Sequence, residues 1–214
     1  MSKLHSRWFK GLSFVALALA AIGVLSAFSL SPASVTDSRS VTRNVNPSSS
    51  FTFSLVPSPG ISSCLPNAKG KATITTGSLN DTMTVSVTGL AKSTGFDLFI
   101  LELPNKPFGV AWYQSDLKTN DEGAGSATVR GIFNKETFSI SLGDNSSPPI
   151  VFPATHQYHL GLWFNNPKVP FNLGCEPGQP QPIITPFNGA QHAGIQVLNT
   201  SNFPDNAGPL SHVS

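Results

Sequence analysis

The sequence predicts an all-β protein: a single antiparallel β-sandwich, or a partly open barrel, of about eight strands. Short segments in which apolar and polar residues alternate recur at regular spacing along the chain. The chain of 214 residues contains 18 Gly and 18 Pro, which supply the turns between these segments. No stretch after the N-terminal region shows the 3.6-residue apolar periodicity of an amphipathic helix.

An N-terminal leader precedes this domain. Lys3, Arg7 and Lys10 come before an uncharged apolar run at 12–28, and small residues follow the run. A basic start, an apolar centre and a small-residue exit are typical of a secretory signal peptide, which we place at 1–33. An uncleaved anchor helix is the alternative, because 17 apolar residues span about 26 Å of a ~30 Å hydrocarbon core. Either way the remaining chain is expected outside the cell or on the extracellular face of the envelope.

The leader also accounts for the basic character of the chain. The whole sequence has 13 Lys and Arg against 11 Asp and Glu, and without the three basic residues of the leader the balance is 10 against 11. No basic cluster follows the leader, so we expect no nucleic-acid partner, and membrane contact only through an uncleaved leader. The charged fraction is 11%, but 15 Phe residues exclude the composition of a disordered chain.

Elements of the first half follow from local patterns. Residues 34–50 lack hydrophobic periodicity and are expected to be a flexible linker. Apolar and hydroxyl side chains alternate at 51–55, which predicts the first strand of a domain over 51–200. Alternation recurs at 71–76 and 82–88 on either side of a Gly-Ser-Leu-Asn-Asp turn, which predicts a hairpin. The next expected strand, 96–103, is apolar on both faces, as is typical of a central strand.

The second half contains longer connections. Residues 104–125 are rich in turn residues and are expected to be a long loop. Alternation resumes at 125–133 and 138–142, and the aromatic and apolar residues at 157–164 predict a further strand. The remaining expected elements are a proline-rich loop at 169–186, a short strand at 195–198 and a polar tail at 201–214.

Two cysteines, Cys64 and Cys175, are expected to form a disulfide, because an even number of cysteines in an exported chain favours pairing. They are 111 residues apart, so the bridge would enclose most of the expected strands. A loop of that length is stabilised by ~4–5 kcal/mol in the chain-entropy treatment. Two free buried thiols, or a pair between two molecules, are the alternatives.

Aromatic residues in or beside the turn-rich segments are the candidate ligand-binding residues. These are Phe108, Trp112, Tyr113 and Trp163, of which Trp163 is followed by Phe-Asn-Asn. Aromatic rings beside Asn, Gln and Asp commonly contact sugar rings and protein partners. The alternative is that Trp112 and Trp163 belong to the core, since tryptophan is highly buried on average.

Three histidines are weak candidates for a metal site: His156 and His159, spaced as H-x-x-H, and His192. On a strand, positions 156 and 159 point to opposite faces, so they chelate poorly, and no third or fourth ligand is evident. The chain after the leader contains no nucleophile elbow, Walker loop or dinucleotide fingerprint. We therefore predict no catalytic residues and no cofactor.

Two parts of the chain resemble known exported proteins. Residues 89–99, with Gly-Leu followed by Thr-Gly-Phe-Asp-Leu-Phe, are similar to a recurring strand start in bacterial exported β-sandwich domains. The segments 133–138 (FNKETF) and 192–200 (HAGIQVLNT) resemble uncharacterised exported proteins of soil bacteria. The resemblance implies a β-sandwich over about 50–210, and it implies no activity and no site residue.

Taken together, these patterns predict an exported, non-enzymatic binding or structural module. Its expected partner is a protein or a carbohydrate, met at the cell envelope or outside the cell. The alternative is a secreted enzyme or metal-binding protein that uses His156 or His159 together with His192.

Overall fold

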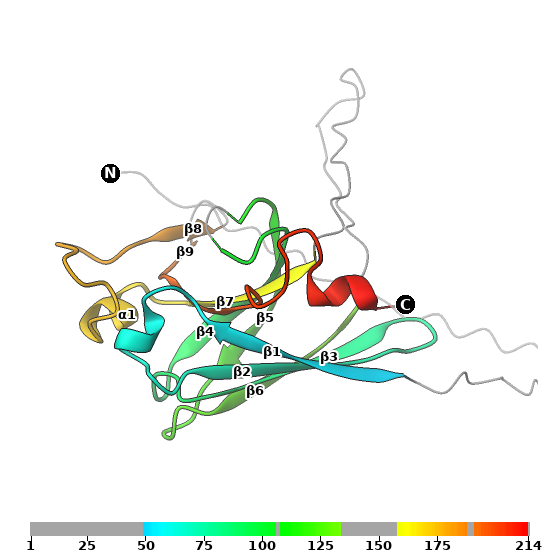
Figure 1. Cartoon of the computed structure of the whole chain (residues 1–214). Helices are drawn as coiled ribbons and strands as arrows, with labels where there is room; N and C mark the ends of the chain where they lie inside the picture. The colour runs from blue at the N-terminus through cyan, green and yellow to red at the C-terminus, as the bar shows by residue number, and fades with distance from the viewer. Residues whose placement is uncertain (1–48, 106–107, 134–157, 188–190, 214) are drawn as a thin grey trace, which may run out of the picture. The chain divides into compact units, whose positions relative to one another are not determined.

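A computed structural model of the chain describes residues 49–105, 108–133, 158–187 and 191–213 (Figure 1). The expected leader, nearly all of the expected linker and the expected strand at 138–142 lie outside these residues. None of the helices in the described part of the chain could span a lipid bilayer.

Strands make up most of the regular structure, as the sequence predicted. In chain order the elements are β1 (Ser50–Pro57), η1 (Ile61–Ser63), β2 (Lys69–Thr75), β3 (Asp81–Thr88), β4 (Gly95–Leu101), β5 (Ala111–Lys118), β6 (Gly125–Gly131), β7 (His159–Phe164), α1 (Lys168–Asn172), β8 (Thr185–Phe187), β9 (Gln191–Ala193), β10 (Gln196–Asn199) and η2 (Pro209–His212).

Eight of these strands form one sheet in the order β5-β4-β7-β10-β1-β2-β3-β6, and every pairing is antiparallel. The prediction of an all-β, antiparallel chain of about eight strands is therefore confirmed. β1 joins the two halves of the sheet, because residues 50–55 pair with β2 whereas Val56 and Pro57 pair with β10. The result is a single sheet that is nearly closed into a barrel.

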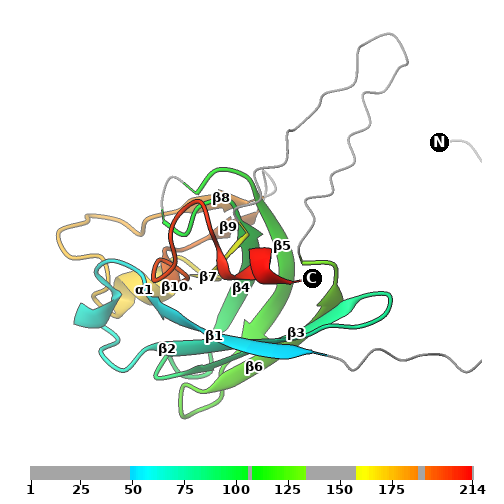
Figure 2. The same ribbon diagram turned by 45° about the vertical axis from the view of Figure 1, so that its right-hand side comes forward.

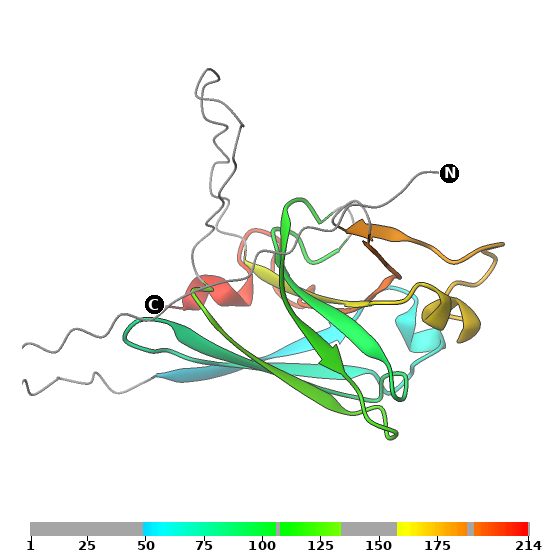
Figure 3. The same ribbon diagram turned by 180° about the vertical axis from the view of Figure 1, so that it is seen from behind.

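The barrel stays open between β5 and β6. These strands follow each other along the chain, but the only bridge between them joins Thr119 and Gly125, beside their connecting turn. They diverge away from that turn (Figure 3). The turn itself is closed by Asn120, whose side-chain Oδ1 accepts the backbone N–H groups of Glu122 and Ala124.

The core fills the interior of the sheet. The alternating residues Met83, Val85 and Val87 of β3 are all fully or almost fully buried there. Phe96 of β4 packs on Phe164 of β7, with ring centroids 5.0 Å apart. Because apolar and hydroxyl residues alternate along the strands, the hydroxyl side chains lie on the outer face of the sheet. There, pairs such as Thr84 and Thr128 form hydrogen bonds between neighbouring strands.

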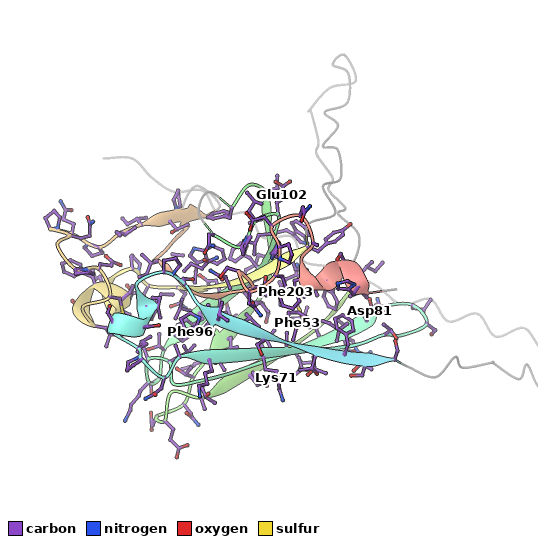
Figure 4. The ribbon with its side chains drawn as sticks, in the orientation of Figure 1. Phe53, Lys71, Asp81, Phe96, Glu102 and Phe203 are labelled. Atoms are coloured by element: carbon purple, nitrogen blue, oxygen red, sulfur yellow. A yellow bond between two sulfur atoms is a disulfide. The ribbon has the colours of Figure 1, made fainter. Side chains whose placement is uncertain are left out.

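The C-terminal segment is part of the folded domain, although the sequence led us to set 201–214 apart as a polar tail. Phe203 packs edge-on against Phe53 of β1, with ring centroids 6.0 Å apart (Figure 4). Leu210 and Val213 of this segment are buried in the core. Polar residues lie between these three apolar side chains. The composition of the segment therefore did not predict that it packs on the core.

The expected long loop at 104–125 was wrong in part, because it contains β5. This strand pairs with β4, but its register shifts between Ser115 and Tyr113, so that Gln114 has no partner on β4. An extra residue of this kind breaks the period of two. Leu117 and Trp112 therefore both pack against the core although they are five positions apart, an odd spacing, and no alternation is visible in the sequence.

The proline-rich stretch 169–186 also contains regular structure, namely α1 and the start of the hairpin formed by β8 and β9. A disulfide joins Cys64, just after η1, to Cys175, just after α1, with 5.0 Å between their Cα atoms. The predicted intramolecular bridge is thus confirmed. It fastens the segment after α1 to the connection between β1 and β2.

The outer face of the sheet, which points away from the core, is covered over β4 and β7 by the β8–β9 hairpin (Figure 2). A second apolar cluster lies beneath this cover, formed by Phe99, Leu101, Trp163 and Ala193. β7 is consequently buried on both faces, as its unbroken run of buried residues shows.

Candidate functional site

A β-bulge in β10 places two polar side chains of the candidate site on the same face of the sheet. Gln196 pairs with Trp163 and Leu198 with Leu162, so Val197 is the extra residue. Without a bulge, residues 196 and 199 would point to opposite faces of the sheet. With it, both Gln196 and Asn199 lie on the outer face, where each is more than nine-tenths buried.

A network of four polar side chains forms there, which we call the amide network: Ser58, Asn105, Gln196 and Asn199. The Asn199 Nδ2 group has three acceptors within hydrogen-bond distance of its two hydrogens, so that one hydrogen is shared: Oε1 of Gln196 at 2.8 Å, Oδ1 of Asn105 at 2.9 Å and Oγ of Ser58 at 3.1 Å. Ser58 Oγ in turn donates to Gln196 Oε1 at 3.0 Å. The network thus joins the end of β1, the β4–β5 loop and β10.

Backbone geometry determines the orientation of these amides. The Ser201 N–H donates to Oδ1 of Asn199 at 2.9 Å, and this turns Nδ2 of Asn199 towards the network. Nδ2 is a donor, so the Gln196 amide presents its oxygen to it. The Nε2 atom of Gln196 then points away and is buried without a hydrogen-bond partner within the described part of the chain.

Space above Gly161 of β7 is shared by two side chains from this region. A Cβ atom at Gly161 would lie 2.4 Å from Cζ3 of Trp163 and 2.7 Å from Nε2 of Gln196. Any side chain at this position would displace one of them. The glycine therefore allows the Trp163 ring and the Gln196 amide to lie together on the outer face.

A pocket of about 320 Å³ opens beside the amide network. We call it the β10 pocket, and its lining comes from β10 and from four connecting segments: Ser58, Pro59, Asn105, Cys175, Glu176, Ile183, Ile195 and Gln196. The polar residues of the lining are three members of the amide network and a carboxylate. The apolar part of the lining comes from a proline, two isoleucines and the disulfide.

Glu176 supplies that carboxylate, and only 6% of the residue is exposed. Its Oε2 accepts the backbone N–H of Ile183 at 2.7 Å, which closes the loop between them. Its Oε1 is buried and has no hydrogen-bond partner among the described residues. Two residues of the lining, Glu176 and Gln196, thus each contain a polar atom that is shielded from solvent and has no partner among the described residues.

The candidate aromatic residues divide between the two faces of the sheet. Trp163 is fully buried and packs edge-on against Phe108 and Phe99, with centroids 5.2 and 5.6 Å away. Tyr113 is half exposed and packs on the other side of Phe99, at 5.7 Å. Trp112, by contrast, packs against the main core. The structure therefore brings Phe108, Tyr113 and Trp163 to the outer face and separates Trp112 from them.

Two carboxylates meet next to Tyr113. Asp97 of β4 and Asp116 of β5 are directly paired across the strands, and Tyr113 donates a 2.8 Å hydrogen bond to Asp116 Oδ1. Burial, the charge of Asp116 and a hydrogen bond to it raise the pKa of Asp97 to about 6. Burial and the hydrogen bond to Asp116 raise the pKa of Tyr113 to about 12. Asp97 can therefore be protonated at a pH only slightly below neutral. Two carboxylates are fewer than the three side chains expected of a metal site.

His159 has a structural environment. It is fully buried at the start of β7, its Nε2 lies 3.1 Å from the carbonyl oxygen of Asp205, and its Nδ1 lies 2.9 Å from Oγ1 of Thr200. A carbonyl only accepts, so Nε2 carries the proton and Nδ1 accepts from the Thr200 hydroxyl. Burial lowers the pKa of His159. The neutral ring therefore ties the C-terminal segment to β7.

The other histidine candidates are not placed by the structure. His156 lies outside the described residues, and for His192 on β9 only the backbone is described. Within the described ranges, no group of three or more His, Cys, Asp or Glu side chains is arranged to hold a metal ion.

The residues of the β10 pocket were not predicted from the sequence. Ser58, Asn105 and Glu176 lie in connections that show no pattern, and they meet only in the folded chain. One signal was present: Gln196 and Asn199 interrupt an otherwise apolar segment, IQVLN, in a short strand. Polar residues in a buried strand need partners, which indicates a polar network or a ligand.

A comparison with protein-family models found no match, and a comparison with curated proteins found no significant similarity.

Proposed function

We propose that this chain is an exported, non-enzymatic binding module that engages a protein or carbohydrate partner through the β10 pocket. One observation carries the proposal: the pocket combines a carboxylate and three side chains of the amide network with a proline and two isoleucines. An apolar lining with a few fixed polar groups is typical of ligand-binding sites.

The size of the pocket supports a small ligand or one unit of a larger partner. Its volume of about 320 Å³ lies at the low end of the roughly 300–1,000 Å³ typical of ligand pockets. A single amino-acid residue or a single sugar ring fits a space of this order. The disulfide at Cys175 and the amide network hold its walls in place, which lowers the entropic cost of binding.

Export is the second part of the proposal. The disulfide between Cys64 and Cys175 fits an oxidising compartment. The basic and apolar leader would direct the chain there, either as a cleaved signal peptide or as a retained anchor. N-terminal sequencing of the protein recovered from an exporting host distinguishes these: a start near residue 34 indicates cleavage, and an intact leader in the membrane fraction indicates an anchor.

A steric variant tests the binding function. Ile183→Phe places a larger side chain in the lining of the pocket, whereas Ile184→Phe alters the next residue, which is exposed and does not line it. Binding to glycan and peptide arrays is then measured for both variants and for the unaltered protein. We expect Ile183→Phe to lose the ligands that the other two proteins retain. Equal binding by all three would contradict the proposal.

The alternative of a metal-binding protein or enzyme receives no support from His159, because both of its ring nitrogens are hydrogen-bonded within the protein.

A further inference from the structure

We propose that the β10 pocket receives one aliphatic side chain of a protein partner, while the backbone carbonyl of the inserted residue accepts a hydrogen bond from Asn105. This inference rests on the proposed binding function and specifies which of the two classes of partner fits the pocket. It follows from the part of the lining that is open to solvent.

The lining divides into a buried part and an accessible part. Four of its residues are more than nine-tenths buried: Ser58, Cys175, Glu176 and Gln196. The other four are open to solvent, because Pro59 is exposed and Asn105, Ile183 and Ile195 are partly exposed. A ligand therefore meets three aliphatic side chains and one amide.

The aliphatic side chains come from three separate connections. Pro59 follows β1, Ile183 precedes β8 and Ile195 precedes β10. Covering their apolar surface with an apolar group is favourable. A sugar ring is commonly held by stacking on an aromatic side chain, and the lining contains none. The volume of about 320 Å³ has room for roughly ten water-sized groups, which is enough for a leucine side chain and part of its backbone.

Asn105 supplies the polar side chain of the accessible part. Its Oδ1 accepts from Nδ2 of Asn199 at 2.9 Å, which determines the end of the Asn105 amide that faces the amide network. The other end, Nδ2 of Asn105, makes no hydrogen bond within the described residues. This group only donates, so the ligand must offer an acceptor beside its apolar group. A peptide residue does so, because its carbonyl group is attached to the carbon that carries the side chain.

Charge disfavours the insertion of an acidic or a basic side chain. Glu176 is the only charged residue of the lining. Its Oε2 accepts the Ile183 N–H at 2.7 Å, and its Oε1 is shielded from solvent. An acidic side chain would be repelled by this charge, and a basic one would lose its hydration without contacting the carboxylate. A neutral, apolar side chain is therefore favoured.

Protein-observed NMR tests this inference, because it detects weak binding and locates it. Two capped tripeptides of nearly equal shape, acetyl-Gly-Leu-Gly-amide and acetyl-Gly-Asn-Gly-amide, are titrated at millimolar concentration and pH 7 into isotope-labelled protein from an exporting host. The chemical shifts of the backbone amides of Ile183, Ile195 and Gln196 report on the pocket. Glucose and N-acetylglucosamine, titrated in the same way, represent the carbohydrate partner.

Two pairs of variants complete the test. Asn105→Asp removes the donor and keeps an oxygen that accepts from Asn199, and Asn80→Asp in an exposed turn is its control. Ile183→Phe fills the pocket, and Ile184→Phe changes the exposed neighbouring residue as its control. The comparison of the two peptides on the unaltered protein needs no variant, so it remains decisive even if a variant fails to fold.

We expect the leucine peptide to shift the three amides and to bind at least tenfold more tightly than the asparagine peptide. Asn105→Asp should weaken its binding at least threefold and Ile183→Phe should abolish the shifts, while both controls leave them unchanged. Unchanged affinity in Asn105→Asp would overturn the role of Asn105.

Equal shifts with both peptides, shifts with the sugars alone, or no shift with either peptide would overturn the inference of an aliphatic side chain. The binding function would still stand if the glycan and peptide arrays found a ligand that Ile183→Phe excludes. If the arrays find no such ligand, both proposals fail.

Discussion

Asn199 Nδ2 lies 2.8 Å from Oε1 of Gln196, and the two residues are three positions apart on the same short strand. The bulge at Val197 makes this contact, because it returns both side chains to the outer face of the sheet. The bond also determines which end of the Gln196 amide is hydrogen-bonded and which has no partner among the described residues.

Asn199→Asp tests this network, because it replaces a donor by an acceptor of the same shape. The new carboxylate would face Oε1 of Gln196 and Oδ1 of Asn105, both of which only accept. We expect the free energy of unfolding in urea to fall by about 3–5 kcal/mol, since a charge is buried opposite two acceptor oxygens and the Ser201 N–H bonds only its other oxygen. Asn80→Asp, in an exposed turn, is the matched control. A fall of under 1 kcal/mol at Asn199 would show that the network contributes little.

The sequence was most informative where a strand keeps a strict period of two. The segment 82–88 was predicted as a strand from Met83, Val85 and Val87, and it became β3 with those residues buried. β5 was missed because the register shift at Gln114 breaks that period. Local alternation reports which face of the sheet a residue occupies only while no residue is inserted.

The candidate site was less predictable for a related reason. The β10 pocket is built from residues near positions 58, 105, 176 and 196, and a bulge and a disulfide bring them together. No local sequence pattern predicts either the bulge or the way in which the connecting loops pack together. The aromatic residues could be identified as candidates from the sequence. The sequence does not show that the β8–β9 hairpin covers Trp163 whereas Tyr113 is half exposed.

Removing the disulfide should cost a large part of the stability. Cys64→Ser combined with Cys175→Ser opens a loop of 111 residues, for which the chain-entropy treatment gives about 4–5 kcal/mol. We expect a corresponding drop in the denaturation midpoint at an unchanged slope. Reductant should shift the unaltered protein towards the double variant and leave the variant itself unaffected. Identical midpoints with and without the bridge would refute the prediction.

Mild acid should destabilise the domain through His159. Burial lowers the pKa of its imidazole below the usual 6.5, and the partners at Asp205 and Thr200 only partly oppose this. The unfolded chain then takes up the proton at a higher pH than the folded one, so the free energy of unfolding declines as the pH falls below about 6.5. Urea titrations between pH 7.5 and 5 measure this slope.

Two variants separate His159 from the other groups that titrate in this range. His159→Gln should have a lower stability at pH 7.5 but a flatter dependence on pH. His212→Gln changes an exposed histidine and should retain the slope of the unaltered protein. If His159→Gln kept the full slope, the acid sensitivity would come from another residue.

Asp97 should act in the opposite direction. Burial first, and then Asp116 across the strand, raise its pKa from 3.8 to about 6. A raised pKa in the folded state means that the contribution of Asp97 to stability is complete below pH 3.8 and is lost as the pH rises through 6. Asp97→Asn keeps the shape and removes the ionisation. Because the site is partly open to solvent, we expect a gain of only roughly 1 kcal/mol at pH 7.5.

The gain in stability from Asp97→Asn should occur only near neutral pH, and it should depend on Asp116. At pH 4, where Asp97 is protonated in the folded protein, Asp97→Asn and the unaltered protein should unfold at nearly the same urea concentration. In a variant that already contains Asp116→Asn, the second change should gain less, because one source of the raised pKa has been removed. A gain of equal size at pH 4 and pH 7.5 would mean that packing, and not ionisation, distinguishes the two side chains.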